Sequence, residues 1–127
     1  MAESDLKVLL ATMEPVLHPE PYGYAVWTGG VVPVAPFATV AEAEGLTVIA
    51  PLAGMRAAGM ASEPWARISL TVHSDLAAVG LTAAFAGALG RVGISCNVVA
   101  GYHHDHLFVQ WDRQDDAMAA LWELSRA

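Results

Sequence analysis

The fold is decided by a stretch in which polar and apolar residues alternate, Ala66-Arg67-Ile68-Ser69-Leu70-Thr71-Val72-His73. A period of two is typical of a strand with one buried face, here the face that carries Ile68, Leu70 and Val72. The segment from about Gly80 to Val92 then changes to helical spacing, with an apolar stripe of Leu81, Phe85, Ala88, Leu89 and Val92. The two patterns predict a strand packed against the helix that follows it.

Two more strands and a last helix are expected after Gly93, which is placed to end the preceding helix. Residues 94–100 and 107–111 alternate again, and they predict an antiparallel pair. Asp112 is expected to cap a helix whose apolar side carries Met118, Leu121, Trp122 and Leu124. Asp115 and Asp116 in its first turn suit the helix dipole. The predicted core of this half is Ile68, Leu70, Val72, Leu81, Phe85, Leu89, Ile94, Cys96, Val98, Leu107 and Val109.

The first half shows a similar order of elements. Ser4 is expected to cap a short helix that carries Leu6, Leu9 and Leu10 and stops at Pro15. Strands are expected at 22–27 and 46–50, separated by a Gly/Pro loop at 29–36, and a helix at 53–60. This order predicts an α+β fold of two β-α-β-β-α-β modules in tandem, residues 1–63 and 64–127, with antiparallel sheets and helices on one face. The first module would lack its opening strand and the second its closing strand.

Composition and charge exclude several classes of protein. The chain has a single cysteine, Cys96, so it forms no internal disulfide and suits a reducing cytoplasm. Its acidic start is unlike a secretory signal, and the uncharged stretches at 21–41 and 76–90 are interrupted by glycine or proline. A net charge of −7 without a run of basic residues makes nucleic acid and anionic membranes poor partners.

Three segments, Val16–Tyr22, Glu44–Pro51 and above all Ile68–Val109, resemble a family of small bacterial tandem ACT-domain proteins. The resemblance implies ferredoxin-like modules, which typically bind amino acids and regulate metabolic enzymes. We expect no catalytic residues and no cofactor. Because ACT modules commonly pair through sheet edges or helical faces, and because this chain is unusually apolar for its size, a homodimer is expected. The alternative is a pair of modules within one chain that needs no partner.

In ACT domains the effector usually lies between the loop after the first strand and a neighbouring second strand. On this chain the resemblance places that site at Ser74, Asp75, Val79, Gly80, Leu81, Ile94, Cys96, Asn97 and Val98. N–H groups beside Gly80 would hold a carboxylate and Asp75 an ammonium, with Asn97 bonding the polar ends. The alternative is that Gly80 only shapes a turn, Asp75 only caps a helix and Asn97 is solvated. The first half has no recognisable counterpart of this loop.

The histidines near residue 104 suggest a second kind of site. His104 and His106 would share a strand face in Tyr102-His103-His104-Asp105-His106, and imidazole with carboxylate is metal-ligand chemistry. A polar hairpin turn explains the segment without a metal, and no bound metal is predicted. His73-Ser74-Asp75 is not expected to be a catalytic triad, and His18 is interpreted as a loop residue. A small-molecule sensor is therefore preferred over an interaction module without ligand, and both over a metal-dependent enzyme that uses His104 and His106.

Overall fold

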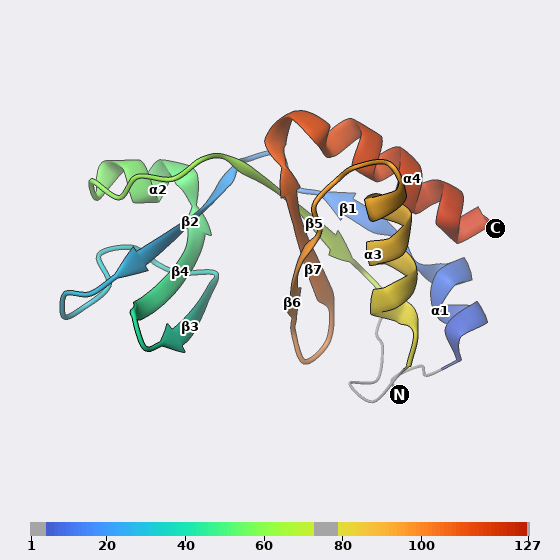
Figure 1. Ribbon diagram of the computed structural model, residues 1–127, viewed down its shortest axis with the longest axis horizontal. Coiled ribbons are helices and arrows are strands. Elements are labelled where there is room, and N and C mark those ends of the chain that lie inside the picture. Colours follow the sequence, from blue (N-terminus) through green and yellow to red (C-terminus); the bar gives the residue numbers. More distant parts are fainter. Residues whose placement is uncertain (1–4, 73–78, 127) are drawn as a thin grey trace.

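The computed structural model describes residues 5–72 and 79–126, and the described chain forms one antiparallel sheet with helices (Figure 1). The elements in order are α1 (Leu6–Thr12), β1 (Pro15–Leu17), β2 (Tyr22–Trp27), β3 (Ala38–Glu42), β4 (Gly45–Pro51), α2 (Leu52–Ala57), β5 (Trp65–Leu70), α3 (Leu81–Arg91), β6 (Asn97–Ala100), β7 (Asp105–Gln110), a 3₁₀ turn (Trp111–Arg113) and α4 (Gln114–Arg126).

The strands follow the order β3-β4-β2-β5-β7-β6, and β1 also pairs with β5. β5 lies at the centre of this arrangement. One edge of β5 pairs with β7. The other edge pairs with two strands: with β1, where Pro15 lies opposite Leu70, and with the start of β2, where Tyr22 lies opposite Trp65. Two groups result, which we call the C-terminal half (α1, β1, β5, α3, β6, β7, α4) and the N-terminal half (β2, β3, β4, α2).

The C-terminal half contains every element of a β-α-β-β-α-β module, and its closing strand comes from the beginning of the chain. β1 takes the outer position beside β5, which gives the local order β1-β5-β7-β6. The N-terminal half keeps the order β3-β4-β2, with α2 after β4 and the loop at 28–37 where a first helix would stand. The predicted α+β fold of two modules is therefore confirmed. The expectation that the first module lacks its opening strand is wrong, because β2 takes that position and the first helix is the missing element.

The main core lies between the sheet and the helices of the C-terminal half, which gather at one end of the molecule (Figure 1). Every residue of the predicted core belongs to this cluster or packs against it. The core also includes Leu9 and Met13, which α1 and the residue after it contribute, and Ala117 and Leu121 of α4. The period-two and helical patterns thus identified the correct buried faces.

Several local expectations need correction. The cap of α1 is Asp5, whose Oδ1 accepts from the N–H of Lys7 at 2.9 Å, whereas Ser4 lies outside the described residues. Asp112 lies in the 3₁₀ turn before α4 and does not cap it, because the chain enters the helix through that turn. The Trp122 side chain is 38% exposed, on the solvent side of α4.

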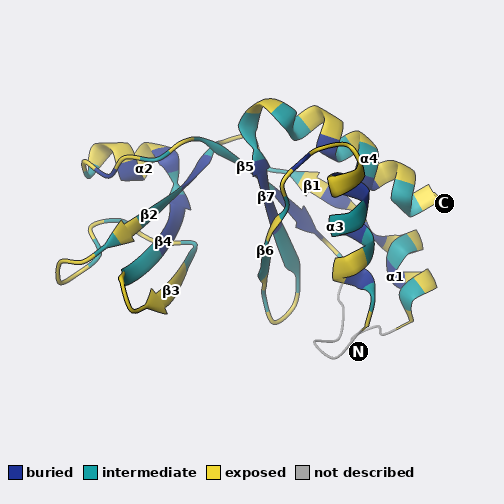
Figure 2. Ribbon diagram, in the orientation of Figure 1, coloured by how far each residue is buried: buried dark blue, intermediate teal, exposed yellow. Residues whose placement is uncertain are grey.

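Two strands were not predicted at all. β1 has only three residues, too few for a readable alternation, and β3 is mostly exposed, so it has no apolar face to recognise (Figure 2). Within the described residues, no helix is long and apolar enough to cross a membrane.

Candidate functional site

The predicted effector loop reaches α3 through Val79 and Gly80, while Ser74, Asp75 and the tripeptide His73-Ser74-Asp75 lie outside the described residues. Val79 is 84% exposed. Gly80 has a φ of 98° and offers no side-chain cap to α3. This positive φ favours glycine, and a Cβ at this position would also lie 3.1 Å from Cδ2 of Leu6, which would have to shift slightly.

The other predicted site residues divide into two groups. Leu81, Ile94, Cys96 and Val98 turn into the main core or pack against it, so a ligand would meet mainly their backbone atoms. Asn97 is exposed, and its Nδ2 donates to the carbonyl oxygen of Phe108 at 3.2 Å. Burial raises the pKa of the Cys96 thiol to about 11, so this thiol is protonated at neutral pH and is a poor nucleophile.

The histidine-rich segment forms the hairpin between β6 and β7. The N–H of Gly101 donates to the carbonyl oxygen of His104 at 2.9 Å, which closes the turn. Nδ1 of His104 donates to the carbonyl oxygen of Val72 at 3.3 Å, whereas His106 faces Ser69. In the described part of the chain, no three His, Cys, Asp or Glu side chains are grouped as a metal would need. The absence of a bound metal stays a prediction.

A polar cluster that the sequence did not reveal lies on the sheet face opposite the main core. Ser69 is at its centre, with its Oγ 2.9 Å from Nε2 of His18 and 2.8 Å from Nδ1 of His106. Arg67, two residues earlier on β5, places Nη2 3.4 Å from the same Nδ1 of His106. His18 reaches the cluster because its backbone N–H donates to the carbonyl oxygen of Arg67 at 2.9 Å, which continues the pairing of β1.

Both imidazoles of this cluster are held in the neutral form. Burial, and next the Arg67 guanidinium, lower the pKa of His106 to about 4. Burial and Arg67 also lower the pKa of His18, while Glu20 opposes the shift. At neutral pH the two rings therefore act as hydrogen-bonding groups and do not add positive charge to that of Arg67.

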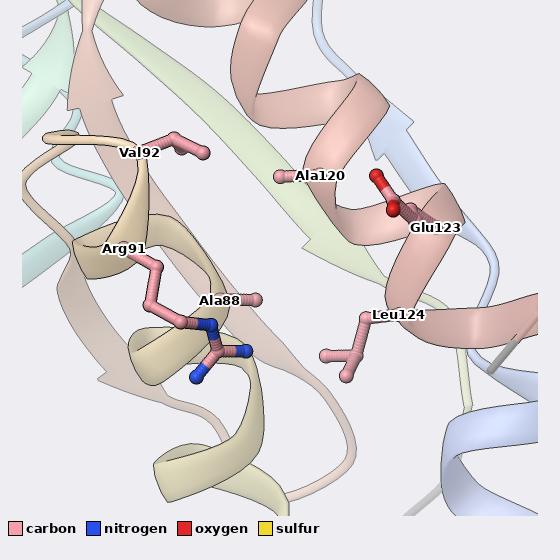
Figure 3. Close-up of a pocket in the computed structure, with 6 residues that line it drawn as sticks. All are labelled: Ala88, Arg91, Val92, Ala120, Glu123 and Leu124. Atoms are coloured by element: carbon pink, nitrogen blue, oxygen red, sulfur yellow. The ribbon is translucent and has the colours of Figure 1, made fainter.

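Two hollows open on other parts of the surface. One, of about 300 Å³, lies between α3 and α4, with apolar atoms of Ala88 and Leu124 inside it and the charged groups of Arg91 and Glu123 at its rim (Figure 3). The second, of about 390 Å³, is lined by Glu63, Pro64, Trp65, Gln110, Trp111 and Asp112. Both are at the lower end of the range for small-molecule sites, and neither includes a predicted site residue.

Comparisons with known proteins agree with this architecture. One family model for the ACT domain matches residues 1–67, and a second ACT-domain model matches residues 61–123. A Vibrio cholerae crystal structure, described as a protein of unknown function and possible transport protein, is 43% identical, with a TM-score of 0.85 over 94% of this chain and 95% of that one.

Two more distant structures share the fold. An Agrobacterium tumefaciens protein is 17% identical, with a TM-score of 0.70 and 84% of each chain covered. The ligand-free regulatory subunit of aspartate kinase from Thermus thermophilus is 10% identical, with a TM-score of 0.65 over 90% of this chain and 97% of that one. A search of curated proteins found no match.

Proposed function

Because this chain belongs to the ACT-domain family, we propose that it is a regulatory protein that binds a small amino-acid-like ligand and is not itself an enzyme. The observation that carries the proposal is that ACT-domain models match both halves of the chain, from residue 1 to residue 123. The regulatory subunit of aspartate kinase has the same fold, which supports a regulatory role without identifying the ligand.

We place the ligand between residues 74–81 of one copy of the chain and the strand that carries Asn97 in a neighbouring copy, because within one copy the 11-residue helix α3 separates the two segments. At the start of α3, a helix of 11 residues, the N–H groups that follow Gly80 would hold a carboxylate, and Asp75 would hold an ammonium. The exposed Val79 side chain and the Asn97 amide would contact the ligand directly. Leu81 of the first copy, and Ile94, Cys96 and Val98 of the neighbouring copy, would lie beneath the ligand.

The experiment begins with a thermal-shift panel of the amino acids. A ligand that binds only the folded protein stabilises it by about 2.7 kcal/mol at 100 times its dissociation constant. Calorimetry of the best hit should then show weaker binding to Asp75→Asn and Val79→Asp, and unchanged binding to the matched control Glu44→Gln, whose exposed side chain lies between β3 and β4. Gly80→Val is less informative, because its backbone conformation would strain any side chain.

Equal affinity in the two site variants would place the ligand elsewhere on the protein. The absence of any hit would favour the second candidate function, an interaction module. Apolar side chains exposed on the outer surface of the helices support this alternative: Val92, directly after α3, is 48% exposed, and it lines the hollow that Leu124 of α4 shares.

We further propose that the protein is a homodimer through this helical surface, with Arg91 of one copy facing Glu123 of the other. Light scattering at micromolar concentration should give twice the mass of 13.4 kDa. A charge-reversing Arg91→Glu variant should shift the mass toward the monomer, and the double variant that adds Glu123→Arg should restore it. A monomeric wild type would contradict the proposal.

A further inference from the structure

The polar cluster around Arg67 has features that the proposed effector site does not use. It lies on the opposite face of the sheet from α3, where Arg67 meets aromatic side chains from the N-terminal half. We infer that Arg67 is the centre of a second binding site, which takes the carboxylate group of a small organic acid between the two halves of the protein. This site is independent of the effector site proposed above.

The first argument comes from the hydrogen bonds of the guanidinium group. Nη1 donates to the Tyr22 hydroxyl at 2.8 Å, a normal hydrogen bond. Nη2 has only the long 3.4 Å contact with Nδ1 of His106, and the buried Nε has no hydrogen-bond partner. Nε and Nη2 form the edge with which arginine binds a carboxylate through two parallel hydrogen bonds. That edge thus lacks the acceptor for which it is shaped.

The second argument is that the charge of Arg67 is not compensated. The ion pair found in the described part of the chain is Arg113–Asp116, so no described carboxylate is in contact with Arg67. Its closest partners are a phenol, neutral imidazoles and aromatic rings. A partly buried cation without a counter-charge is unfavourable, and a ligand carboxylate would supply both the missing charge and the missing acceptor.

The third argument is the direction of the hydrogen bonds around His106. A guanidinium can only donate, so Nδ1 of His106 is an acceptor and the ring carries its proton on Nε2. Ser69 must then donate its hydroxyl proton to the same Nδ1, and its oxygen accepts from Nε2 of His18. Because Ser69 already satisfies His106, Arg67 Nη2 can turn to a carboxylate without leaving the imidazole unpaired.

The fourth argument concerns the walls of the site. The Phe37 ring lies over the guanidinium carbon of Arg67 at 4.1 Å, and the Tyr22 ring lies at 5.3 Å. Phe108 contacts both rings, with centroid distances of 5.8 Å to Phe37 and 5.7 Å to Tyr22. Apolar walls keep water away from the charge and strengthen its attraction to an anion. They also suit a ligand with a hydrocarbon part, so an organic acid fits better than phosphate.

The test uses propionate as the probe, followed by NMR of the imidazole signals of His18 and His106. Propionate should cause saturable shifts of both signals, whereas chloride at equal ionic strength should cause only linear drift and phosphate should bind more weakly. Arg67→Lys keeps the positive charge but loses the two parallel N–H donors of Nε and Nη2, so the affinity for propionate should fall about tenfold or more. The matched control Arg91→Lys, at the rim of the hollow between α3 and α4, should bind as the wild type does.

Each contrary outcome overturns the inference in a recognisable way. No saturable shift would mean that Arg67 only joins the two halves through its aromatic contacts. Equal responses to chloride would indicate screening, and tighter phosphate binding would indicate a general oxyanion site. If Arg67→Lys fails to fold, the wild-type protein alone still tests the inference. Bound propionate should show nuclear Overhauser contacts between its methyl group and the Phe37 ring. Contacts with other rings only would place the probe elsewhere.

Discussion

The two halves of the protein have the same kind of module, but their buried cores and their covering helices differ greatly in size. In the C-terminal half, α1, α3 and α4 cover one face of the sheet, and thirteen buried described residues form a single core: Leu9, Met13, Ala66, Ile68, Leu70, Leu81, Phe85, Leu89, Ile94, Leu107, Val109, Ala117 and Leu121. The N-terminal half has the six-residue helix α2 and a core of Val48, Ala50, Met55 and Met60. The difference arises because a loop at 28–37 replaces one helix.

The N-terminal half therefore depends on its contact with the other half. Backbone pairing between β2 and β5 is limited to Tyr22 opposite Trp65. Side chains add further contacts: Tyr22 and Ile49 pack against Phe108 of β7, and Arg67 of β5 donates a hydrogen bond to the Tyr22 hydroxyl. Because few buried groups hold β3 and β4 in place by themselves, we expect the N-terminal half to open more readily than the C-terminal half.

The largest effect is expected from Phe85→Ala in the main core. Phe85 is fully buried on α3, and its removal leaves a cavity among three helices and the sheet, so it should destabilise the protein by about 3 to 5 kcal/mol. Met55→Ala in the smaller core should cost about 2 kcal/mol, because the thin layer around it can collapse. Urea denaturation of both variants measures the difference. Equal losses would mean that the two halves are equally supported.

A change at the junction between the halves should uncouple them. Phe108→Ala removes a fully buried ring that contacts Tyr22, Tyr24 and Phe37, at an expected cost of about 3 kcal/mol. Hydrogen exchange should accelerate more in β4 than in β5, because Ile49 of β4 loses the Phe108 ring of the opposite half against which it packs. Uniform acceleration across both strands would show that the halves unfold as one unit.

A smaller effect is expected at the start of α1, which packs on the C-terminal half alone. Asp5 Oδ1 accepts from the N–H of Lys7 and, at 3.4 Å, of Val8. Asp5→Ala should therefore cost about 1 kcal/mol, whereas Asp5→Asn, which keeps an accepting oxygen, should be close to the wild type. Chemical denaturation of the three proteins is the measurement. An Asn variant as unstable as the Ala variant would point to the charge as the stabilising feature.

The last expected effect is confined to acid pH and originates on the sheet face between the halves. The folded-state pKa of His106 is about 4, below its ordinary value of 6.5, because of burial and the nearby Arg67, with His104 and His18 adding to the shift. As pH falls from 6.5 toward 4, the unfolded chain binds the proton first, so acid destabilises the fold in this window and has no such effect above it. His18 has the same sign.

Replacing the imidazole tests this assignment. The variant His106→Gln should show a shallower loss of stability between pH 6.5 and pH 4 than the wild type, measured by urea denaturation at several pH values. Identical slopes in the two proteins would refute the shifted pKa.

Local sequence patterns correctly predicted those parts of the protein whose burial repeats within one segment. Alternation identified the strand at 22–27 and the buried faces of β5 and β7, and helical spacing identified α3. Gly93 was correctly placed after α3, where its φ is 75°. These signals are readable because burial repeats every two or every 3.6 residues within one segment. The division at residues 63 and 64 and the effector residues stay predictions.

The contacts between distant segments became visible in the folded protein and could not be predicted from local patterns. Nothing in three residues of β1 indicates that they will pair with β5, more than fifty positions later. The polar cluster was not predicted for the same reason: His18 lies 51 positions from Ser69 in the sequence, and His106 lies 37 positions from it. Arg67 and Ser69 lie on the polar face of an alternating strand. From the sequence alone, this face cannot be distinguished from one that is exposed to solvent. They became a site because β1, β7 and Phe37 of the N-terminal half enclose that face, a long-range arrangement that no local pattern encodes.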